Sequence, residues 1–154
     1  MERMYCAFLG EDITQFFVVV PSAIGGKTVS AIGENAFKDN ESIITLYIPS
    51  TVKTVGSNAF AGCSNLIQIT FSEGIETVGK YALGDTALTN VTLPKSLVTI
   101  GEKAFGSYEN DKLVQDFTVY AFGGTAACTF ANDNGFKLVT VESKTDSSTG
   151  ITVI

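Results

Sequence analysis

A repeat of about 23 residues constrains the fold of this chain more than any other feature of its sequence. The repeat is clearest over residues 43–60, 66–83 and 88–105, where an apolar Leu-x-x-Ile-x-Ile pattern precedes Val-x-x-Val-Gly and then Ala-Phe or Ala-Leu. The glycines recur with spacings of 23, 23 and 22 residues, at Gly33, Gly56, Gly79 and Gly101. A period in the twenties with a constant order of apolar positions predicts a solenoid of stacked turns of chain.

Each regular turn of the predicted solenoid, here called a rung, begins with a strand, expected over residues 43–48, 66–71 and 88–93. Because strand side chains alternate between two faces, the fourth and sixth residues of each strand are expected to face the interior. The sequence therefore predicts one interior column, formed by Leu46, Ile69 and Val91. The Val-x-x-Val-Gly segment is interpreted as a short return strand that ends in a glycine turn. The Ala-Phe pair is interpreted as a turn or 3₁₀ segment that buries one large side chain.

An order-of-magnitude comparison shows why such rungs must stack. One rung supplies roughly seven apolar side chains, each worth about 1.5–3 kcal/mol when fully buried. Ordering the backbone of some 23 residues costs roughly 1–2 kcal/mol for each residue. A single rung is therefore unstable, and stability is expected to come from stacking, which buries the core and pairs each strand with its neighbours.

The two ends of the array depart from the regular pattern. In the first rung, Val18 and Val20 match the inward residues of the later strands, and the Gly25-Gly26 pair suits a turn with positive φ. A fifth strand is expected over residues 114–120, followed by a helix from about Thr125 to Asn134 and a strand over 136–141, which together would cap the core. The predicted organisation is a solenoid over 1–141, comprising a partial rung (1–42), regular rungs (43–113) and a last strand with a cap (114–141), followed by 142–154 as a linker or the start of a further domain.

Composition excludes several classes of function. The net charge is −6 and no block of Lys or Arg is present, which argues against binding nucleic acid or anionic lipid. No apolar run reaches the length of about 18 residues needed to cross a bilayer, so no membrane insertion is expected. The first 20 residues lack the pattern of a signal peptide, which leaves either a mature fragment or a protein not exported by that route.

The three cysteines do not describe a disulfide framework or a metal site. Cys63 occupies a small-residue position of the repeat and is expected to be a buried thiol that packs as a small hydrophobic group. Cys6 and Cys128 lie outside the regular rungs, and the sequence leaves a pairing between them open.

A longer motif can be traced over residues 55–78, VGSNAFAGCSNLIQITFSEGIETV, and partial copies extend it from about Val18 to Val141. This motif resembles the BspA-type leucine-rich repeat, and residues 119–139 also look like the terminal unit of such proteins in gut bacteria. The resemblance implies a right-handed leucine-rich-repeat coil of short parallel strands, in an extracellular or cell-surface protein of a bacterium, in some cases an adhesin. It supplies no catalytic motif.

The chain contains no histidine, which removes the commonest general base and histidine-dependent metal sites. Carboxylate pairs such as Glu73 with Glu76, or Asp111 with Asp116, are expected to be solvated charges on loops. No enzyme activity, cofactor or metal is therefore expected.

The remaining candidate site is the outward face of the parallel strands. Its predicted members are Thr45, Tyr47, Gln68, Thr70, Asn90, Thr92, Asp116 and Thr118. Hydroxyl and amide groups, with Tyr47 as an aromatic anchor, suit a protein or peptide ligand. An alternative is that threonine fills these positions only because it favours β structure. A second function, in which the chain is a structural spacer or self-association module that presents another domain, also remains open.

Overall fold

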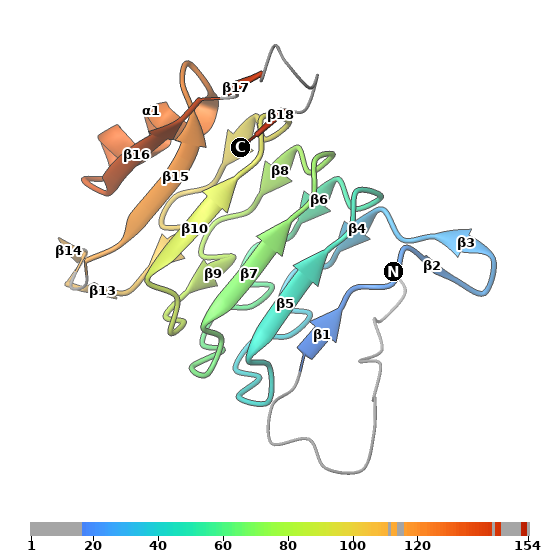
Figure 1. Cartoon of the computed structure of the whole chain (residues 1–154). Helices are drawn as coiled ribbons and strands as arrows, with labels where there is room; N and C mark the ends of the chain where they lie inside the picture. The colour runs from blue at the N-terminus through green and yellow to red at the C-terminus, as the bar shows by residue number, and fades with distance from the viewer. Residues whose placement is uncertain (1–16, 111, 114–115, 143, 146–151, 154) are drawn as a thin grey trace.

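The computed structural model describes residues 17–110, 112–113, 116–142, 144–145 and 152–153, which form a solenoid of stacked rungs with one helix towards the C-terminus (Figure 1). The predicted repeat architecture is confirmed. Strands from successive rungs build two arrays, which we call the front ladder and the back ladder. The front ladder contains β1 (Phe17–Val19), β5 (Thr45–Ile48), β7 (Gln68–Phe71), β10 (Asn90–Leu93), β15 (Thr118–Phe122) and β16 (Lys137–Val141). The back ladder contains β4 (Ala31–Ile32), β6 (Thr54–Val55), β8 (Thr77–Val78) and β11 (Thr99–Ile100).

Front-ladder strands alternate between buried apolar residues and exposed or half-buried polar ones, as period-2 patterning requires. All three members of the predicted interior column are buried. Leu46 lies directly opposite Ile69 in the β5–β7 pair, and Val91 lies opposite Val119 in the β10–β15 pair. The column therefore exists as predicted and extends one strand further towards the cap.

Hydrogen bonding along the front ladder is interrupted at one step. The strands form two separate sheets, β1–β5–β7 and β10–β15–β16, although β7 and β10 run side by side (Figure 1). The back ladder is continuous in the order β4–β6–β8–β11. The expectation that each front strand pairs with both neighbours is therefore wrong between β7 and β10, where the back ladder maintains the backbone connection between rungs.

The recurring glycine of each rung is required by close approach between rungs. A Cβ atom on Gly79 would lie 2.6 Å from the amide nitrogen of Ser57 and 2.8 Å from the carbonyl carbon of Gly56. Gly56 and Gly101 show the same crowding against the backbone of the preceding rung. None of these three glycines has positive φ. The left-handed backbone lies two residues further on, at Asn35, Asn58, Tyr81 and Lys103, with φ of 57, 54, 53 and 52°.

The turn after each glycine buries one large side chain, as predicted. Phe60, Leu83 and Phe105 are all fully buried, and the rings of Phe37 and Phe60 stack with centroids 5.2 Å apart. Amide-to-carbonyl hydrogen bonds link these turns from rung to rung, as in Phe60 to Ala82 at 2.8 Å. The last two turns form short parallel strands, β9 (Leu83–Gly84) and β12 (Phe105–Gly106).

Three antiparallel hairpins project from the ladders. In the first hairpin, Gly25 and Gly26 form the turn, and both have positive φ as predicted. The hairpins are β2 (Ala23–Ile24) with β3 (Lys27–Thr28), β13 (Tyr108–Glu109) with β14 (Lys112–Leu113), and β17 (Lys144–Thr145) with β18 (Thr152–Val153). The assignment of residues 142–154 as a linker or the start of a further domain stays a prediction.

Helix α1 (Ala126–Asp133) and β16 form the C-terminal cap. The helix ends in a left-handed residue, Gly135, with φ of 72°. The amide of Phe136 donates to the carbonyl of Ala131 at 2.9 Å and that of Gly135 donates to Asn132 at 3.4 Å, the two bonds of a Schellman motif. Gly135 therefore terminates the helix as the sequence predicts.

An aromatic cluster joins the cap to the last rung. Phe130 of α1 packs edge-on against Phe105 at 6.1 Å between centroids, and it also contacts Phe136 at 5.5 Å. Phe117 lies between Phe105 and Phe136, at 6.3 and 5.4 Å. These rings cover the interior where another rung would otherwise be needed.

Candidate functional site

The outward residues of β5 and β7 lie side by side. Thr45 is directly opposite Gln68, and Tyr47 is directly opposite Thr70. Gln68 and Thr70 are exposed, whereas Thr45 and Tyr47 are half-buried. These four predicted residues therefore form two short rows that cross the front ladder.

The second sheet continues the rows with a different register from the predicted one. Asn90 lies opposite Thr118, and Thr92 lies opposite Tyr120. Asp116 is exposed but precedes β15, so its predicted position in the outward row of the strand is wrong. Thr118 does face outward, but level with Asn90 instead of Thr92.

The physical reason for this two-residue shift is the position of Phe117. The sequence pattern around residues 114–120 suggested that Phe117 would lie opposite Val91, as the fourth residue of a regular strand. Phe117 instead packs in the aromatic cluster of the cap, and Val119 takes the place opposite Val91. The irregular connection before β15 provides the extra length that makes this shift possible.

The sequence analysis missed five further residues on the same face. Phe17 and Val19 lie opposite Thr45 and Tyr47, and they are 55% and 37% exposed. Beyond β15, Lys137 lies opposite Thr118 and Val139 lies opposite Tyr120. The match of Val18 and Val20 to inward positions already implied that Phe17 and Val19 point outward. The complete face, here called the front face, consists of Phe17, Val19, Thr45, Tyr47, Gln68, Thr70, Asn90, Thr92, Thr118, Tyr120, Lys137 and Val139.

Tyr47 is held in a fixed orientation on the front face. Its hydroxyl accepts a hydrogen bond of 2.8 Å from the hydroxyl of Ser72. Ser72 follows β7 at the position where the other two regular rungs have Pro49 and Pro94. The single departure from proline in the repeat thus anchors the aromatic ring, which lowers the entropy that Tyr47 would lose on binding a partner.

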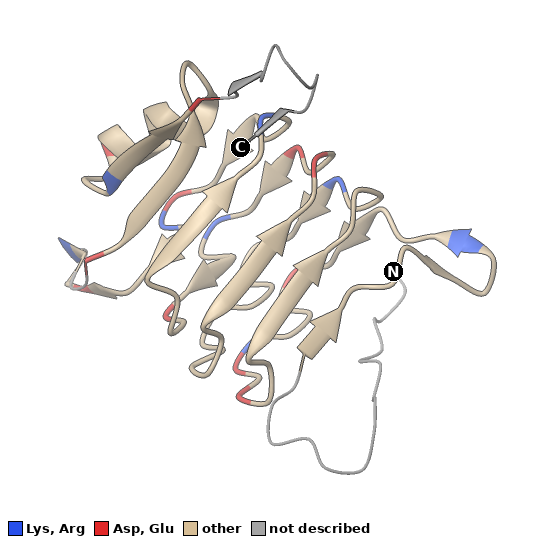
Figure 2. Ribbon diagram, in the orientation of Figure 1, with Lys and Arg blue, Asp and Glu red and all other residues tan. Residues whose placement is uncertain are grey.

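Charged side chains gather mainly at the turns and leave the front face largely neutral. Figure 2 shows acidic and basic residues at strand ends, and strands β5, β7, β10 and β15 contain none. Lys137 on β16 is the charged exception on this face. A neutral face rich in hydroxyl and amide groups favours contact through hydrogen bonds over electrostatic attraction.

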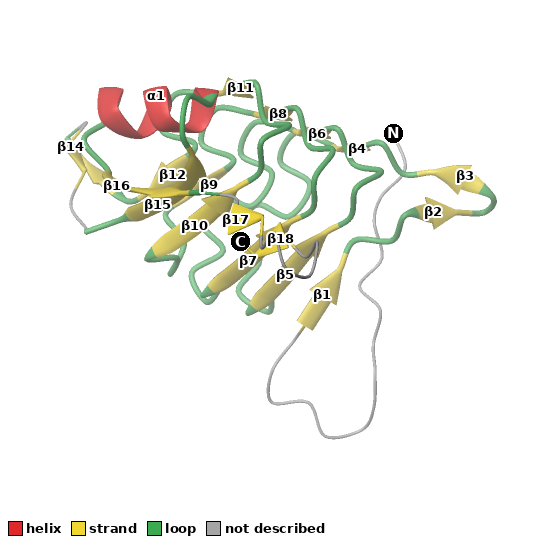
Figure 3. Ribbon diagram, turned by 45° about the horizontal axis from the view of Figure 1, so that its top comes forward, coloured by secondary structure: helices red, strands yellow, loops and turns green. Residues whose placement is uncertain are grey.

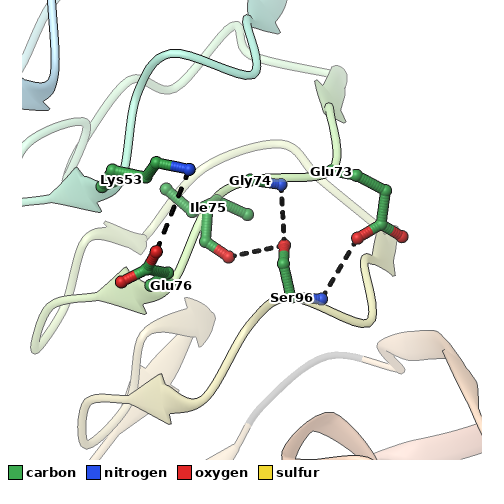
Figure 4. A network of polar contacts seen from close by, with 6 residues as sticks. All are labelled: Lys53, Glu73, Gly74, Ile75, Glu76 and Ser96. Atoms are coloured by element: carbon green, nitrogen blue, oxygen red, sulfur yellow. Dashed lines mark hydrogen bonds and ion pairs between the residues drawn. The ribbon is translucent and has the colours of Figure 1, made fainter.

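The carboxylates singled out in the sequence serve to connect rungs. Glu73 accepts hydrogen bonds of 3.1 Å from the backbone amides of Lys95 and Ser96 (Figure 4). The Ser96 hydroxyl accepts a bond of 2.9 Å from the Gly74 amide and donates one of 2.7 Å to the Ile75 carbonyl.

Glu76 lies 3.9 Å from Lys53 and forms an exposed ion pair between two rungs. A similar pair joins Lys80 to Glu102 at 2.8 Å, and this hydrogen bond raises the pKa of Lys80. Asp111 lies outside the described residues. Glu73 and Glu76 are therefore engaged in the scaffold and do not form a catalytic pair.

The repeat can be compared with known families on this geometry. The model of the BspA type leucine rich repeat region matches residues 22–113, in six copies. The chain belongs to the BspA-type leucine-rich repeat family.

Solved structures share the fold of this BspA-type chain. It is similar to a leucine-rich repeat protein from Bacteroides capillosus at 26% identity and a TM-score of 0.59, over 72% of this chain and 80% of that one. It is also similar to the pneumococcal vaccine antigen PcpA at 24% identity and a TM-score of 0.53, over 66% of this chain and 24% of that one. A search of curated protein sequences gave no significant match.

Both thiols that the structure describes in the BspA-type solenoid are buried and unbridged. Cys63 is fully buried, as predicted, and its thiol donates to the carbonyl of Phe37 at 3.1 Å. Burial raises the pKa of Cys63, and the nearby carboxylate of Asp39 acts in the same direction. Cys128 donates to the carbonyl of Phe122 at 3.0 Å, and Cys6 lies outside the described residues.

Other kinds of site find little support in the part of the BspA-type chain that the structure describes. No three His, Cys, Asp or Glu side chains of that part gather closely enough to hold a metal ion. Its helix is too short to span a bilayer. The front face is accordingly the strongest candidate for function.

Proposed function

We propose that this chain is a non-catalytic protein-binding module of a bacterial cell-surface or secreted protein, and that it acts in adhesion or in interaction with a host or other microbes. The front face is its binding surface. Membership of the BspA-type family, whose proteins are associated with bacterial surfaces, supports the location. The observation that carries the proposal is the pair of outward rows, which present hydroxyl, amide and aromatic groups on one flat face.

The size of the front face limits the kind of partner. Six strands at a spacing of about 4.8 Å give a width of about 24 Å, and a four- or five-residue strand is about 15 Å long. The face is therefore about 360 Å², less than half of the roughly 800 Å² that each protein contributes to a standard interface. A peptide or the edge of one protein fits this area, and the affinity is expected to be in the weak, transient class.

Two tyrosines are the expected energetic centre of the interface. Tyr47 is fixed by Ser72 and flanked by Val19 and Thr70 in its row, and Tyr120 lies between Thr92 and Val139 in the same row. Aromatic side chains with a polar tip dominate many protein interfaces, because they bury a large area with few rotatable bonds.

A binding assay with charged variants tests this proposal. The purified chain is immobilised and probed with a panel of purified host extracellular-matrix proteins and bacterial surface proteins, and each interaction is measured by surface plasmon resonance. The double variant Tyr47→Glu with Thr70→Glu places two charges on the face and is expected to weaken binding at least tenfold. Thr92→Glu, at an exposed position without a side-chain hydrogen bond, is expected to weaken it about threefold or more.

The matched control is Ala31→Glu, because Ala31 is exposed on the back ladder. This control is expected to bind like the unmodified chain, and circular dichroism checks that all variants are folded. If a folded double variant keeps full affinity, the front face is not the binding surface. That outcome, together with concentration-dependent self-association, would favour the spacer or self-association module.

A further inference from the structure

Each step of the back ladder is made by the same backbone groups. In the step from β8 to β11, the amide of Thr99 donates to the carbonyl of Glu76 at 3.0 Å, and the amide of Gly101 donates to that of Val78 at 2.8 Å. In a parallel pair, successive residues direct their N–H and C=O groups alternately to one neighbouring strand and to the other. Thr99 therefore faces β8, and the residues on either side of it face the opposite way.

The outer edge of β11 presents these backbone groups without a partner. Both the N–H and the C=O of Ile100 point away from β8, as does the C=O of Val98, in the places that Val78 and Glu76 occupy one rung earlier. No group of the described chain hydrogen-bonds to them. An unpaired strand edge of this kind is a template for another extended segment.

Helix α1 follows β11 where a further back strand would otherwise stand, and it leaves a groove beside this edge (Figure 3). The groove has a volume of about 430 Å³, within the range of ligand-binding clefts. It is lined by Val98, Ile100, Gly101, Glu102, Ala126, Thr129, Phe130, Asp133 and Asn134. Val98 is 69% exposed, more than any other large apolar side chain of the described residues that are noted as exposed.

The charges around the groove select a basic occupant. Glu102 and Asp133 line it, and no lysine or arginine does. Asp133 is the last residue of α1, and the last turn of this helix contains no basic residue. The negative end of the helix dipole thus adds to the carboxylate of Asp133, and a cation placed there would be favoured.

We infer that this groove binds an extended segment of a partner protein, which pairs in parallel with β11 and carries a Lys or Arg level with Glu102. The segment has a glycine level with Gly101, because each rung in this column leaves no room for a Cβ atom in the rung that follows it. A β-branched residue precedes this glycine and packs beside Val98 and Phe130. The site is separate from the front face and does not depend on it.

A peptide with the sequence of residues 75–80, acetyl-Ile-Glu-Thr-Val-Gly-Lys-amide, is a direct probe of this inference, because the same residues occupy the equivalent place in the back ladder. Isothermal titration calorimetry with the whole chain is expected to show saturable binding with one site. Methylation of the glycine amide nitrogen removes the donor to Ile100 and is expected to weaken binding at least tenfold. Methylation of the valine amide nitrogen, which points away from β11, is expected to change it less than twofold.

A charge exchange tests the basic position. Asp133→Lys, at an exposed residue, is expected to weaken binding of the peptide at least fivefold. A peptide with glutamate in place of its lysine is expected to bind this variant better than the unmodified chain. The front-face variant Tyr47→Glu with Thr70→Glu is expected to bind the peptide normally, so failure of one site leaves the other testable.

Three results would overturn the inference. Absence of saturable binding at millimolar peptide would show that the groove does not accept a strand. Equal weakening by the two methylations would show that pairing with the edge of β11 is not the basis of binding. Self-association of the chain that the peptide abolishes would assign the groove to a second copy instead of a different protein.

Discussion

Replacement of Gly79 by alanine tests whether the rungs are as closely stacked as the glycine column requires. The added Cβ would lie 2.6, 2.8 and 2.9 Å from three backbone atoms of the preceding rung, in Ser57 and Gly56. Backbone atoms cannot rotate away as the end of a side chain can. The Gly79 amide also donates to the Val55 carbonyl at 2.8 Å, which resists separation of the rungs.

The expected cost can be worked from the distance that must be regained. The closest pair needs to move by about 0.8 Å to reach ordinary contact at 3.4 Å. A gap of this size forfeits roughly a third of each dispersion contact, so about 40 atom pairs at about 0.15 kcal/mol each would lose about 2 kcal/mol. This estimate agrees with the range of about 1–3 kcal/mol for overpacked sites. The corresponding fall in Tm is about 4–8 °C for a chain of this size.

Gly123→Ala is the matched control for this substitution. Gly123 has no positive φ, and a Cβ at this position would meet nothing within 4 Å. Alanine there is expected to leave stability unchanged or to raise it by up to about 1 kcal/mol, through the lower entropy of the unfolded chain. The two substitutions are chemically identical, so the difference between them measures the close approach of the rungs.

Urea unfolding followed by far-UV circular dichroism and tyrosine fluorescence provides the measurement, since the chain contains no tryptophan. The slope of the transition must be compared as well, because a repeat array that unfolds in parts would show a reduced slope. Equal stability of Gly79→Ala and Gly123→Ala would refute the reasoning, since the stacking distance between rungs could then not be the reason for the repeated glycine.

The other predictions concern the scaffold around the two surfaces. Ser96→Ala removes the two hydrogen bonds of a half-buried hydroxyl and is expected to cost about 1–3 kcal/mol in urea unfolding, whereas an equal stability of the variant would show that the inter-rung network contributes nothing. Gly135→Ala forces a residue with a Cβ into a φ of 72° and is expected to cost about 1–2 kcal/mol; no loss relative to Gly123→Ala would contradict the left-handed helix end. For Cys63, whose pKa is raised above the usual 9.0, the unfolded chain loses the thiol proton first, so this group's contribution to stability is complete below about pH 9 and falls as pH rises further. Unfolding under reducing conditions at pH 7.5 and 9.5 measures this fall, and Cys63→Ala, which is expected to abolish that part of it, would show the same pH dependence if the reasoning were wrong.

Much of the candidate site could be predicted because outward and inward positions alternate within a strand. Thr45, Tyr47, Gln68 and Thr70 follow directly from that alternation and from the spacing of the rungs. The interior column and the helix that ends at Gly135 were predictable for the same reason. Each depends on residues near one another in the chain, where side-chain direction and cap geometry are set by local backbone conformation.

The register of β15 could not be predicted in the same way. A strand aligned on Phe117 satisfies the apolar pattern as well as one aligned on Val119, and the choice depends on rings from β12, α1 and the segment before β16. For this reason the outward position of Asp116 was wrong and that of Tyr120 was missed. The role of Ser72 was equally hidden, because it depends on Tyr47 in the neighbouring rung.

The sequence by itself determined that this chain is a solenoid, which residues form its interior and where its cap begins. Periodicity and alternation are enough for this, since every rung repeats the same local geometry. Only the tertiary structure decided the break in the front ladder, the reason for the glycine column and the unpaired edge of β11 beside α1. These features depend on distances between rungs and on how the cap packs against the last one, and residues far apart in the chain set both.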